Sequence, residues 1–293
     1  MNNEDEDFTA NDDYWKIDRA PLISIITVCY NAEKDIEKTL HSVLNQTDID
    51  YEYIIIDGKS TDNTMCKIQR YLSDFSEKKI DIKLISECDA GIFDAMNKGI
   101  KLARGTWINF MNAGDFFSDT SILERMKEYL IKSKADIVYG SCYRYHPFYS
   151  YVKVPGNLDL LKKGMEIPHQ ASFIRGAVQK KHLFSLRYRL AGDHDLFLRL
   201  YLQGYSFEYV PVLVCIFSLE GVSNTRLLEA YKETYLVLTK NKVADLKSMN
   251  SKLKYVRGYV GCLCEMMLPT NLKWKLKAMK KELADKTKTN RRY

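Results

Sequence analysis

Strand-type and helix-type segments alternate four times between residues 22 and 111, and this alternation constrains the fold more than any other feature. Apolar, largely β-branched runs at 22–29, 51–56, 80–86 and 107–111 are typical of strands. Between them, apolar residues recur at spacings of three and four, as on one buried face of a helix. The pattern therefore predicts an α/β fold with a doubly wound, mostly parallel sheet.

Polar loops follow three of these strands, at 27–31, 57–62 and 112–115. In an open α/β sheet, ligands bind beyond the carboxyl ends of the strands, where such loops meet. A carboxylate there can hold a divalent cation against a diphosphate, because hard cations take oxygen ligands. A solvated turn is the alternative interpretation. No GxGxxG or GxxxxGK[ST] motif is present, which argues against a dinucleotide oxidoreductase and a P-loop NTPase.

A second acidic centre lies at 190–200, where Asp193 and Asp195 fall in the first turn of a predicted helix. The helix dipole favours acids there, and one of them is explained as a cap. The other is a candidate general base facing the loops. His169 lies just before a predicted strand at 171–175, where a lone histidine is usually structural.

An aromatic, loop-rich stretch at 143–151 allows two interpretations. It can form an adaptable wall of a binding site, because its rings alternate with polar side chains. It can equally form an exposed hairpin, and the sequence does not choose between them.

The chain of 293 residues is long enough for one large α/β domain with an appendage. We expect an acidic, flexible lead-in at 1–20, the α/β domain at 21–226 and a helical, basic region at 227–293. The seven cysteines are scattered without a CxxC pair, which favours reduced thiols in the cytoplasm. The lead-in has no apolar signal-peptide core, and the longest apolar run, at 209–219, is too short to cross a membrane.

The C-terminal region combines apolar and basic side chains in the manner of an amphipathic surface. From this pattern we predict peripheral attachment to the inner face of the cytoplasmic membrane. A helix pair packed on the α/β domain, or a dimer contact, is the alternative. The residues concerned are Tyr255, Trp274, Leu276 and Met279 among Lys252, Lys254, Arg257, Lys273, Lys275, Lys277, Lys280 and Lys281.

Six motifs carry a resemblance to a known family. They are SIITVCYN at 24–31, IIIDGKSTDNT at 54–64, DAGIFDAMNKGI at 89–100, GTWINFMNAGD at 105–115, PHQASFIR at 168–175 and AGDHDLFLRL at 191–200. In this order they resemble family 2 glycosyltransferases of the GT-A (Rossmann-like) fold. The most similar branch is the bacterial one that builds exopolysaccharide, colanic-acid-type or O-antigen repeats.

The resemblance implies an inverting transfer of a sugar from a nucleotide-diphosphate donor to a glycan or lipid-linked acceptor. A UDP-sugar is the expected donor, a hexosyl or N-acetylhexosaminyl group the expected cargo, and Mn²⁺ or Mg²⁺ the expected cofactor. No nucleic acid is expected as a partner. The sequence names neither the sugar nor the oligomeric state.

The resemblance also assigns residues to roles, carried over position by position. Asp193 corresponds to the general base, and Asp115, together with Asn112, occupies the metal-binding position. The donor-binding positions are Thr27, Val28, Tyr30, Asn31, Asp57, Asp89, Asp94 and Asn112, and acceptor contacts are expected at His169, Gln170 and Asp195.

The chain departs from the family pattern at several positions. Gly58 follows Asp57 where two adjacent acids are usual, and the metal motif keeps one carboxylate, Asp115. Met96 stands where many relatives have arginine, and Glu220 is only a candidate for a C-terminal metal ligand. A catalytically weak nucleotide-sugar-binding or assembly subunit is therefore the alternative function. A nucleotidyltransferase on a related sheet is a more distant one.

Overall fold

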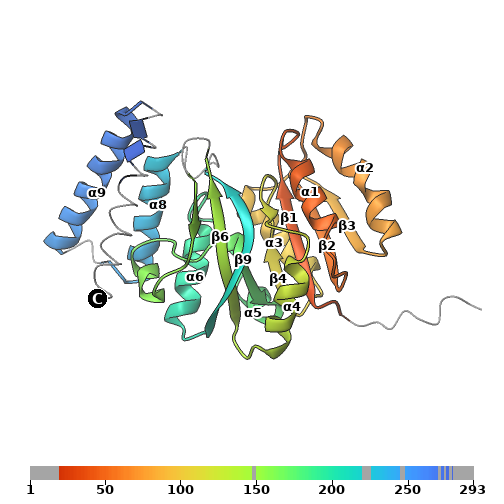
Figure 1. Cartoon of the computed structure of the whole chain (residues 1–293). Helices are drawn as coiled ribbons and strands as arrows, with labels where there is room; N and C mark the ends of the chain where they lie inside the picture. Colours follow the sequence, from red (N-terminus) through yellow and green to blue (C-terminus); the bar gives the residue numbers. More distant parts are fainter. Residues whose placement is uncertain are drawn as a thin grey trace, which may run out of the picture.

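A computed structural model of the chain describes residues 20–146, 150–219, 226–244, 248–269, 272–273, 275–276 and 279. Its centre is one sheet with the strand order β3-β2-β1-β4-β8-β6-β9-β5, and β7 pairs with β6 outside this path (Figure 1). Strands β1 to β4 are parallel, β8 runs antiparallel to both its neighbours, and β9 is parallel to β6. The predicted α/β, mostly parallel sheet is confirmed.

The elements have the following bounds. The strands are β1 (Ile23–Cys29), β2 (Tyr51–Asp57), β3 (Asp81–Ser86), β4 (Trp107–Phe110), β5 (Phe116–Phe117), β6 (Ile137–Tyr145), β7 (Tyr151–Lys153), β8 (Ser172–Arg175) and β9 (Phe207–Ser218). The α-helices are α1 (Ile36–Leu44), α2 (Thr64–Glu77), α3 (Ile92–Leu102), α4 (Ile122–Lys132), α5 (Gly176–Lys181), α6 (Gly192–Leu202), α8 (Leu227–Lys240) and α9 (Met249–Met267). Two short 3-10 helices span Leu158–Lys162 and His169–Ala171.

Helices cover both faces of the sheet, which is why its central strands are predominantly apolar. Every residue of β1, β2 and β4 is buried. One face packs against apolar side chains of α1, α2 and α4, and the other against those of α3, α6 and α8. Buried on both faces, a strand keeps no polar side, and this explains the continuous β-branched runs in the sequence.

Two predicted elements differ in length or form from the structure. The sequence also predicts a strand at 136–139, which extends as β6 to Tyr145 because it pairs along its length with β9 and then with β7. The aromatic stretch at 143–151 thus forms a β6–β7 hairpin, although residues 147–149 lie outside the described residues. Apolar residues at helical spacing within 32–45 predict a helix there, and α1 begins only at Ile36.

Helix α8 packs against the α/β core. Its Val237 and Leu238 are buried in the same apolar cluster as α6. The Glu233 carboxylate accepts hydrogen bonds from the backbone N–H groups of residues 189, 190 and 191, at 2.7 to 3.0 Å. Since this turn leads directly into α6, α8 holds the start of that helix in place.

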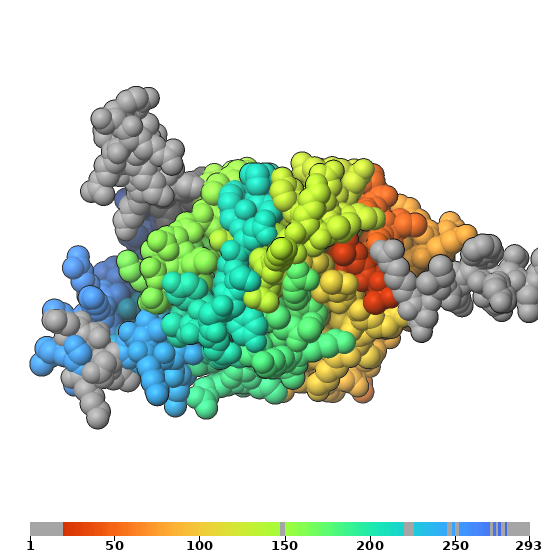
Figure 2. All heavy atoms as spheres, turned by 90° about the horizontal axis from the view of Figure 1, so that it is seen from below, coloured from red at the N-terminus to blue at the C-terminus, as the bar shows by residue number. Residues whose placement is uncertain are grey.

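Helix α9 packs on α8 with one side and exposes the other. Tyr255 contacts the rings of Tyr231 and Tyr235, and a Cβ at Gly258 would lie 2.0 Å from the Tyr231 hydroxyl. Figure 1 shows the α8–α9 pair at one end of the sheet, and Figure 2 shows the N-terminal strands and helices at the opposite end. No helix within the described residues is long and apolar enough to span a bilayer.

Several predicted features fall where the structure gives no description. The acidic lead-in, apart from residue 20, and the turn at Glu220 lie outside the described residues. The same holds for Trp274, Lys277, Lys280 and Lys281 of the basic region. The division of the chain at residue 226 stays a prediction.

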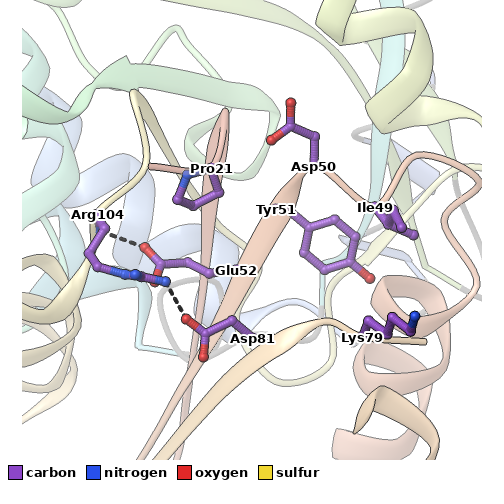
Figure 3. Close-up of a pocket in the computed structure, with 8 residues that line it drawn as sticks. All are labelled: Pro21, Ile49, Asp50, Tyr51, Glu52, Lys79, Asp81 and Arg104. Atoms are coloured by element: carbon purple, nitrogen blue, oxygen red, sulfur yellow. Dashed lines mark hydrogen bonds and ion pairs between the residues drawn. The ribbon is translucent and has the colours of Figure 1, made fainter. Parts of the chain in front are cut away.

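The amino ends of the strands carry an ion network around the buried Glu52 carboxylate. The Glu52 side chain accepts hydrogen bonds from Ser24 (2.6 Å), Lys83 (2.8 Å) and the Arg104 side chain (3.2 Å), and Arg104 also contacts Asp81 (Figure 3). Burial alone would raise the pKa of Glu52, but these donors outweigh it and lower the pKa to about 2. Every buried oxygen of this carboxylate therefore has a partner, and the network closes the edge of the sheet opposite the polar loops.

We expect Glu52→Gln to destabilise the fold by about 3 kcal/mol at pH 7, because Lys83 and Arg104 lose their buried counter-ion. A folded-state pKa below the ordinary 4.5 gives stability that is present above pH 4.5 and lost as the pH falls toward 2. Urea unfolding of both proteins should therefore show a gap that closes in that window. Asp81→Asn is the control: this half-exposed partner of Arg104 should cost less than about 1 kcal/mol. A gap independent of pH would contradict the assignment.

Candidate active site

The polar loops at the carboxyl ends of β1, β2 and β4 are held together by two threonines. Thr27 is fully buried, and its hydroxyl bonds to the carbonyl of residue 111 (2.7 Å) and to Tyr53 (2.8 Å). Thr39 of α1 donates to the carbonyl of Asp115 (2.7 Å) and accepts from the Gly114 N–H (2.9 Å). Gly114 has φ +98°, a conformation that favours glycine. These contacts fix the turn at 112–115. The Thr27 side chain is buried and holds the backbone just before this turn.

Tyr30, Gly58 and Asp89 meet at one end of these loops. Tyr30 is 62% exposed, and the neighbouring Asn31 adopts φ 47° with its side chain bonded to the Thr61 N–H. A Cβ at Gly58 would lie 2.5 Å from Asp89 Oδ2 and 3.3 Å from the Tyr30 ring. The Asp89 carboxylate thus occupies the space beside the position where the family usually carries its second acid. The exposed aromatic ring could stack on a flat nucleobase, and the carboxylate next to it could accept a hydrogen bond from that base.

Two other acids predicted to bind the donor have internal partners. Asp57 is fully buried and accepts from Ser60 Oγ (2.5 Å) and Ser86 Oγ (2.6 Å), so it joins the ends of β2 and β3. Asp94 accepts from the Ala90 N–H at 3.0 Å, in the first turn of α3. Their predicted contacts with the donor are untested and stay predictions, as does that of Val28, which is buried in β1.

Asp115 and Asn112 provide oxygen atoms at the end of β4. Asp115 is 8% exposed, and its Oδ2 accepts a hydrogen bond from Gln170 Nε2 at 2.9 Å. Burial raises the pKa of Asp115 to about 7, and the Gln170 amide opposes this shift only in part. Asn112 Oδ1 is buried and has no hydrogen-bond partner. A buried carboxylate and an orphan amide oxygen are both stabilised by a hard cation.

Asp115 and Asn112 could bind a metal ion together with other ligands, such as phosphate oxygens and water. The described residues contain no group of three or more His, Cys, Asp or Glu that could hold an ion by themselves. Two protein oxygens with a diphosphate and water are nevertheless a usual way to bind Mg²⁺ or a similar ion. Asp115 and Asn112 fit that arrangement.

Asp193 lies in the first turn of α6 and is half-buried. Burial raises the pKa of this carboxyl, while the backbone N–H of His194, which donates to Oδ1 at 2.7 Å, acts in the opposite direction. The position of the turn depends on Gly192, because a Cβ there would lie 2.6 Å from the Phe93 ring of α3. A carboxylate with a raised pKa is a better proton acceptor than an ordinary one.

The remaining predicted acceptor residues have different surroundings. Gln170 contacts Asp115, as described above. Asp195 is buried and bonds Arg199 (2.8 Å) and Asn241 (3.1 Å), which links α6 to the end of α8. His169 is 6% exposed and packs among the rings of Phe110, Phe184 and Phe197; burial lowers its pKa to about 4. Asp195 and His169 are therefore held by contacts within the protein. Their contacts with the acceptor stay untested predictions.

Sequence reasoning missed two residues that shape this site. Thr39 orders the metal-position turn, but a threonine inside an amphipathic helix gave no signal of it. Arg144 extends from β6 within electrostatic reach of Asp193, whose pKa it lowers. An arginine within the aromatic stretch was visible in the sequence, but its proximity to α6 depends on the sheet order.

The mostly parallel sheet, with acids at the carboxyl ends of its strands and a further acid on a later helix, agrees with the GT-A fold. Solved structures support this fold. The mannosyltransferase PcManGT from Pyrobaculum calidifontis, in complex with GDP-Man and Mn²⁺, superposes with a TM-score of 0.62 at 15% identity, over 91% of this chain and 81% of that one. S. aureus TarS 1-349 in complex with UDP-GlcNAc gives 0.62 at 15% identity, over 86% and 78%.

The sequence comparison is more specific. Residues 24–180 match the family model described as Glycosyl transferase family 2. A PGL/p-HBAD biosynthesis glycosyltransferase of Mycobacterium bovis is 31% identical over 210 residues, which cover 70% of this chain and 80% of that relative. The chain belongs to glycosyl transferase family 2.

Proposed function

We propose that this glycosyltransferase moves a hexosyl or N-acetylhexosaminyl group, with inversion, from a UDP-sugar to a glycan or lipid-linked acceptor in surface polysaccharide synthesis. The observation that carries the proposal is the pair of separated acids. Asp115 is buried and lies in the same turn as Asn112, whose amide oxygen is an orphan, and Asp193 lies in the first turn of a different element, where burial raises its pKa. Asp115 is placed to help bind the leaving diphosphate through a metal ion, and Asp193 is placed to accept the proton of the attacking hydroxyl.

The chemistry divides between these two acids. Asp115 and Asn112 would hold Mn²⁺ or Mg²⁺, which supplies positive charge to the departing diphosphate. Asp193 Oδ1 already accepts from the His194 N–H, so Oδ2 takes the proton of the acceptor hydroxyl. As that oxygen bonds to the anomeric carbon, the bond from this carbon to the diphosphate oxygen breaks on the opposite face. Holding both substrates in line supplies much of the remaining acceleration.

The nucleobase would stack on the exposed Tyr30 ring, next to the Asp89 carboxylate. Asp89 Oδ1 already accepts from the Gly91 N–H (2.8 Å), which leaves Oδ2 to receive an N–H of the base. Uracil has one ring N–H suited to such an acceptor. This contact is compatible with a UDP-linked donor, and a comparison of nucleotides is needed to distinguish it from bases that carry N–H groups of their own.

Thermal unfolding with UDP, GDP, CDP or dTDP, each with and without Mn²⁺, tests the function. A ligand at 100 times its Kd adds about 2.7 kcal/mol, which a melting curve resolves. We expect a shift with UDP that requires the metal. No shift with any nucleotide would favour the alternative, a catalytically weak binding or assembly subunit.

Asp89→Ala tests the base contact. We expect the variant to bind UDP at least roughly 10-fold more weakly, because it loses a hydrogen bond to a charged acceptor. Titration calorimetry with UDP and Mn²⁺ measures this change, and Asp81→Asn at the opposite edge of the sheet is the control. UDP affinity equal to that of the wild type would remove Asp89 from the donor site.

We also propose that α9 attaches the enzyme to an anionic lipid surface, at the inner face of the membrane. Its outer stripe is defined by Met249, Leu253, Val256, Val260, Leu263 and Met267, which are 40% to 85% exposed. Successive members are four, three, four, three and four residues apart, so they share one side of the helix. Exposed basic side chains at Lys252, Lys254 and Arg257 accompany this stripe. Their positive charge supports an anionic lipid surface over a second copy of the same basic helix.

Vesicle co-sedimentation tests this attachment. The full-length protein should sediment with phosphatidylglycerol vesicles, less so at high salt, and Leu253→Glu with Val260→Glu should abolish it. Ile131→Glu is the matched control, because Ile131 is 63% exposed but lies on α4. Unchanged sedimentation of the double variant would refute the attachment. A wild-type dimer that the double variant converts to a monomer would assign the stripe to self-association instead.

A further inference from the structure

Arg144 carries a charge that the structure leaves without a counter-ion. Its guanidinium donates to Tyr151 Oη at 3.4 Å, contacts the Cys142 thiol, and lies 5.6 Å from the centre of the Phe217 ring. Its Nε is buried and has no hydrogen-bond partner. No carboxylate of the described part of the chain forms an ion pair with it, and Tyr151 and Cys142 are the side chains with the largest effects on its pKa. A half-buried cation without an ion-pair partner is costly unless an anion joins it.

The backbone fixes this side chain at the rim of the active site. Arg144 pairs with Tyr151 of β7 and with Phe217 of β9, so both neighbours lie in its own cross-strand row. Strands β4 and β6 both run antiparallel to β8, and therefore the carboxyl end of β6 lies at the same edge as that of β4. Arg144 is the second-last residue of β6. The cross-strand row of Tyr151, Arg144 and Phe217 therefore lies at the same edge of the sheet as the candidate active site.

We propose that Arg144 forms an anion subsite on the acceptor side of the active site, which binds a phosphate group of the acceptor. This inference rests on the proposed glycosyl transfer. The guanidinium is planar and lies between Tyr151 and Phe217, and its fork of N–H donors has the geometry that matches a phosphate.

The acceptor side is favoured by the neighbours of Arg144. Its positive charge acts on Asp193, the candidate base for the acceptor hydroxyl, and lowers the pKa of that acid. Arg144 does not act on the pKa of Asp115, the acid on the diphosphate side. A cation next to the base also offsets the repulsion between the Asp193 carboxylate and an anionic acceptor.

Binding of inorganic phosphate to the full-length enzyme saturated with UDP and Mn²⁺ tests the subsite. We expect calorimetric titration to show phosphate binding that Arg144→Gln weakens by roughly 10-fold or more, a usual effect of losing a charged hydrogen bond. Arg144→Lys, which keeps the charge but not the paired donors, should have an intermediate effect. Chloride at equal ionic strength serves as the reference.

Arg175→Gln is the matched control. Arg175 also stacks on a ring, 4.4 Å from the centre of Trp107, but its N–H groups donate to the carbonyls of residues 133 and 135 at the opposite edge of the sheet. It should bind phosphate like the wild type.

Three outcomes would overturn the subsite. Equal phosphate binding by the wild type and by a folded Arg144 variant would show that this side chain binds no phosphate. If Arg144→Gln does not fold, Arg144→Lys binding like the wild type removes the need for paired donors. Phosphate that competes with UDP, rather than binding beside it, would assign the anion to the donor diphosphate. Failure of UDP itself to bind would instead contradict the proposed function.

Discussion

Asp193→Asn should lower glycosyl transfer by about 100-fold or more, a usual effect of removing a general base, while UDP affinity stays the same. The amide keeps the shape of the side chain and can still accept from the His194 N–H, but it cannot take a proton. Nucleotide release in steady-state assays, together with calorimetric UDP binding, separates the two effects. Asp195→Asn is the control, because Asp195 bonds Arg199 and Asn241 and its loss should affect stability more than turnover. Normal turnover by Asp193→Asn would assign the base elsewhere.

The pH dependence of the wild type gives a second check on Asp193. A base works only when deprotonated, so a raised pKa moves the acidic limb of the kcat profile to higher pH. The limb should lie above the value of about 3.9 for an ordinary aspartate. It should be absent from the residual activity of Asp193→Asn.

Asp115→Asn should weaken the metal-dependent part of UDP binding by at least roughly 10-fold, on the scale seen when metal sites are disturbed. The variant retains an oxygen near Gln170 but loses the negative charge that a cation requires. Titration with UDP in Mn²⁺ and again in EDTA isolates the metal-dependent part, and the EDTA values should agree between variant and wild type. Asp119→Asn, at a half-exposed carboxylate paired with Arg125, should behave like the wild type in both buffers. Equal affinity of Asp115→Asn and wild type in Mn²⁺ would place the metal elsewhere.

The sheet could be predicted from the sequence because its signals are local. An apolar β-branched run such as 22–29 predicts a buried strand wherever it occurs, and alternation with helices then predicts parallel order. The same logic placed Asp115 at a strand end. Local signals also indicated the first turn of α6 that carries Asp193.

Most of the detail at the site depends on contacts between residues far apart in the sequence. The approach of Asp89 to Gly58 requires the order β3-β2-β1, and the hydrogen bond from Gln170 to Asp115 requires β8 to insert beside β4. Nothing near Asp57 in the sequence shows that Ser60 and Ser86 occupy its carboxylate. The sequence thus predicted which kinds of side chain lie at the site, but not which residue each of them contacts.

The hydrogen bonds between Glu233 and the turn at 189–191 distinguish α8 from the rest of the C-terminal region. Helix α8 contributes no reacting group, yet it immobilises the backbone just before Asp193. Helix α9 packs on α8. We therefore expect a chain cut after α8 to keep the backbone geometry around Asp193, and a chain cut before α8 to lose it.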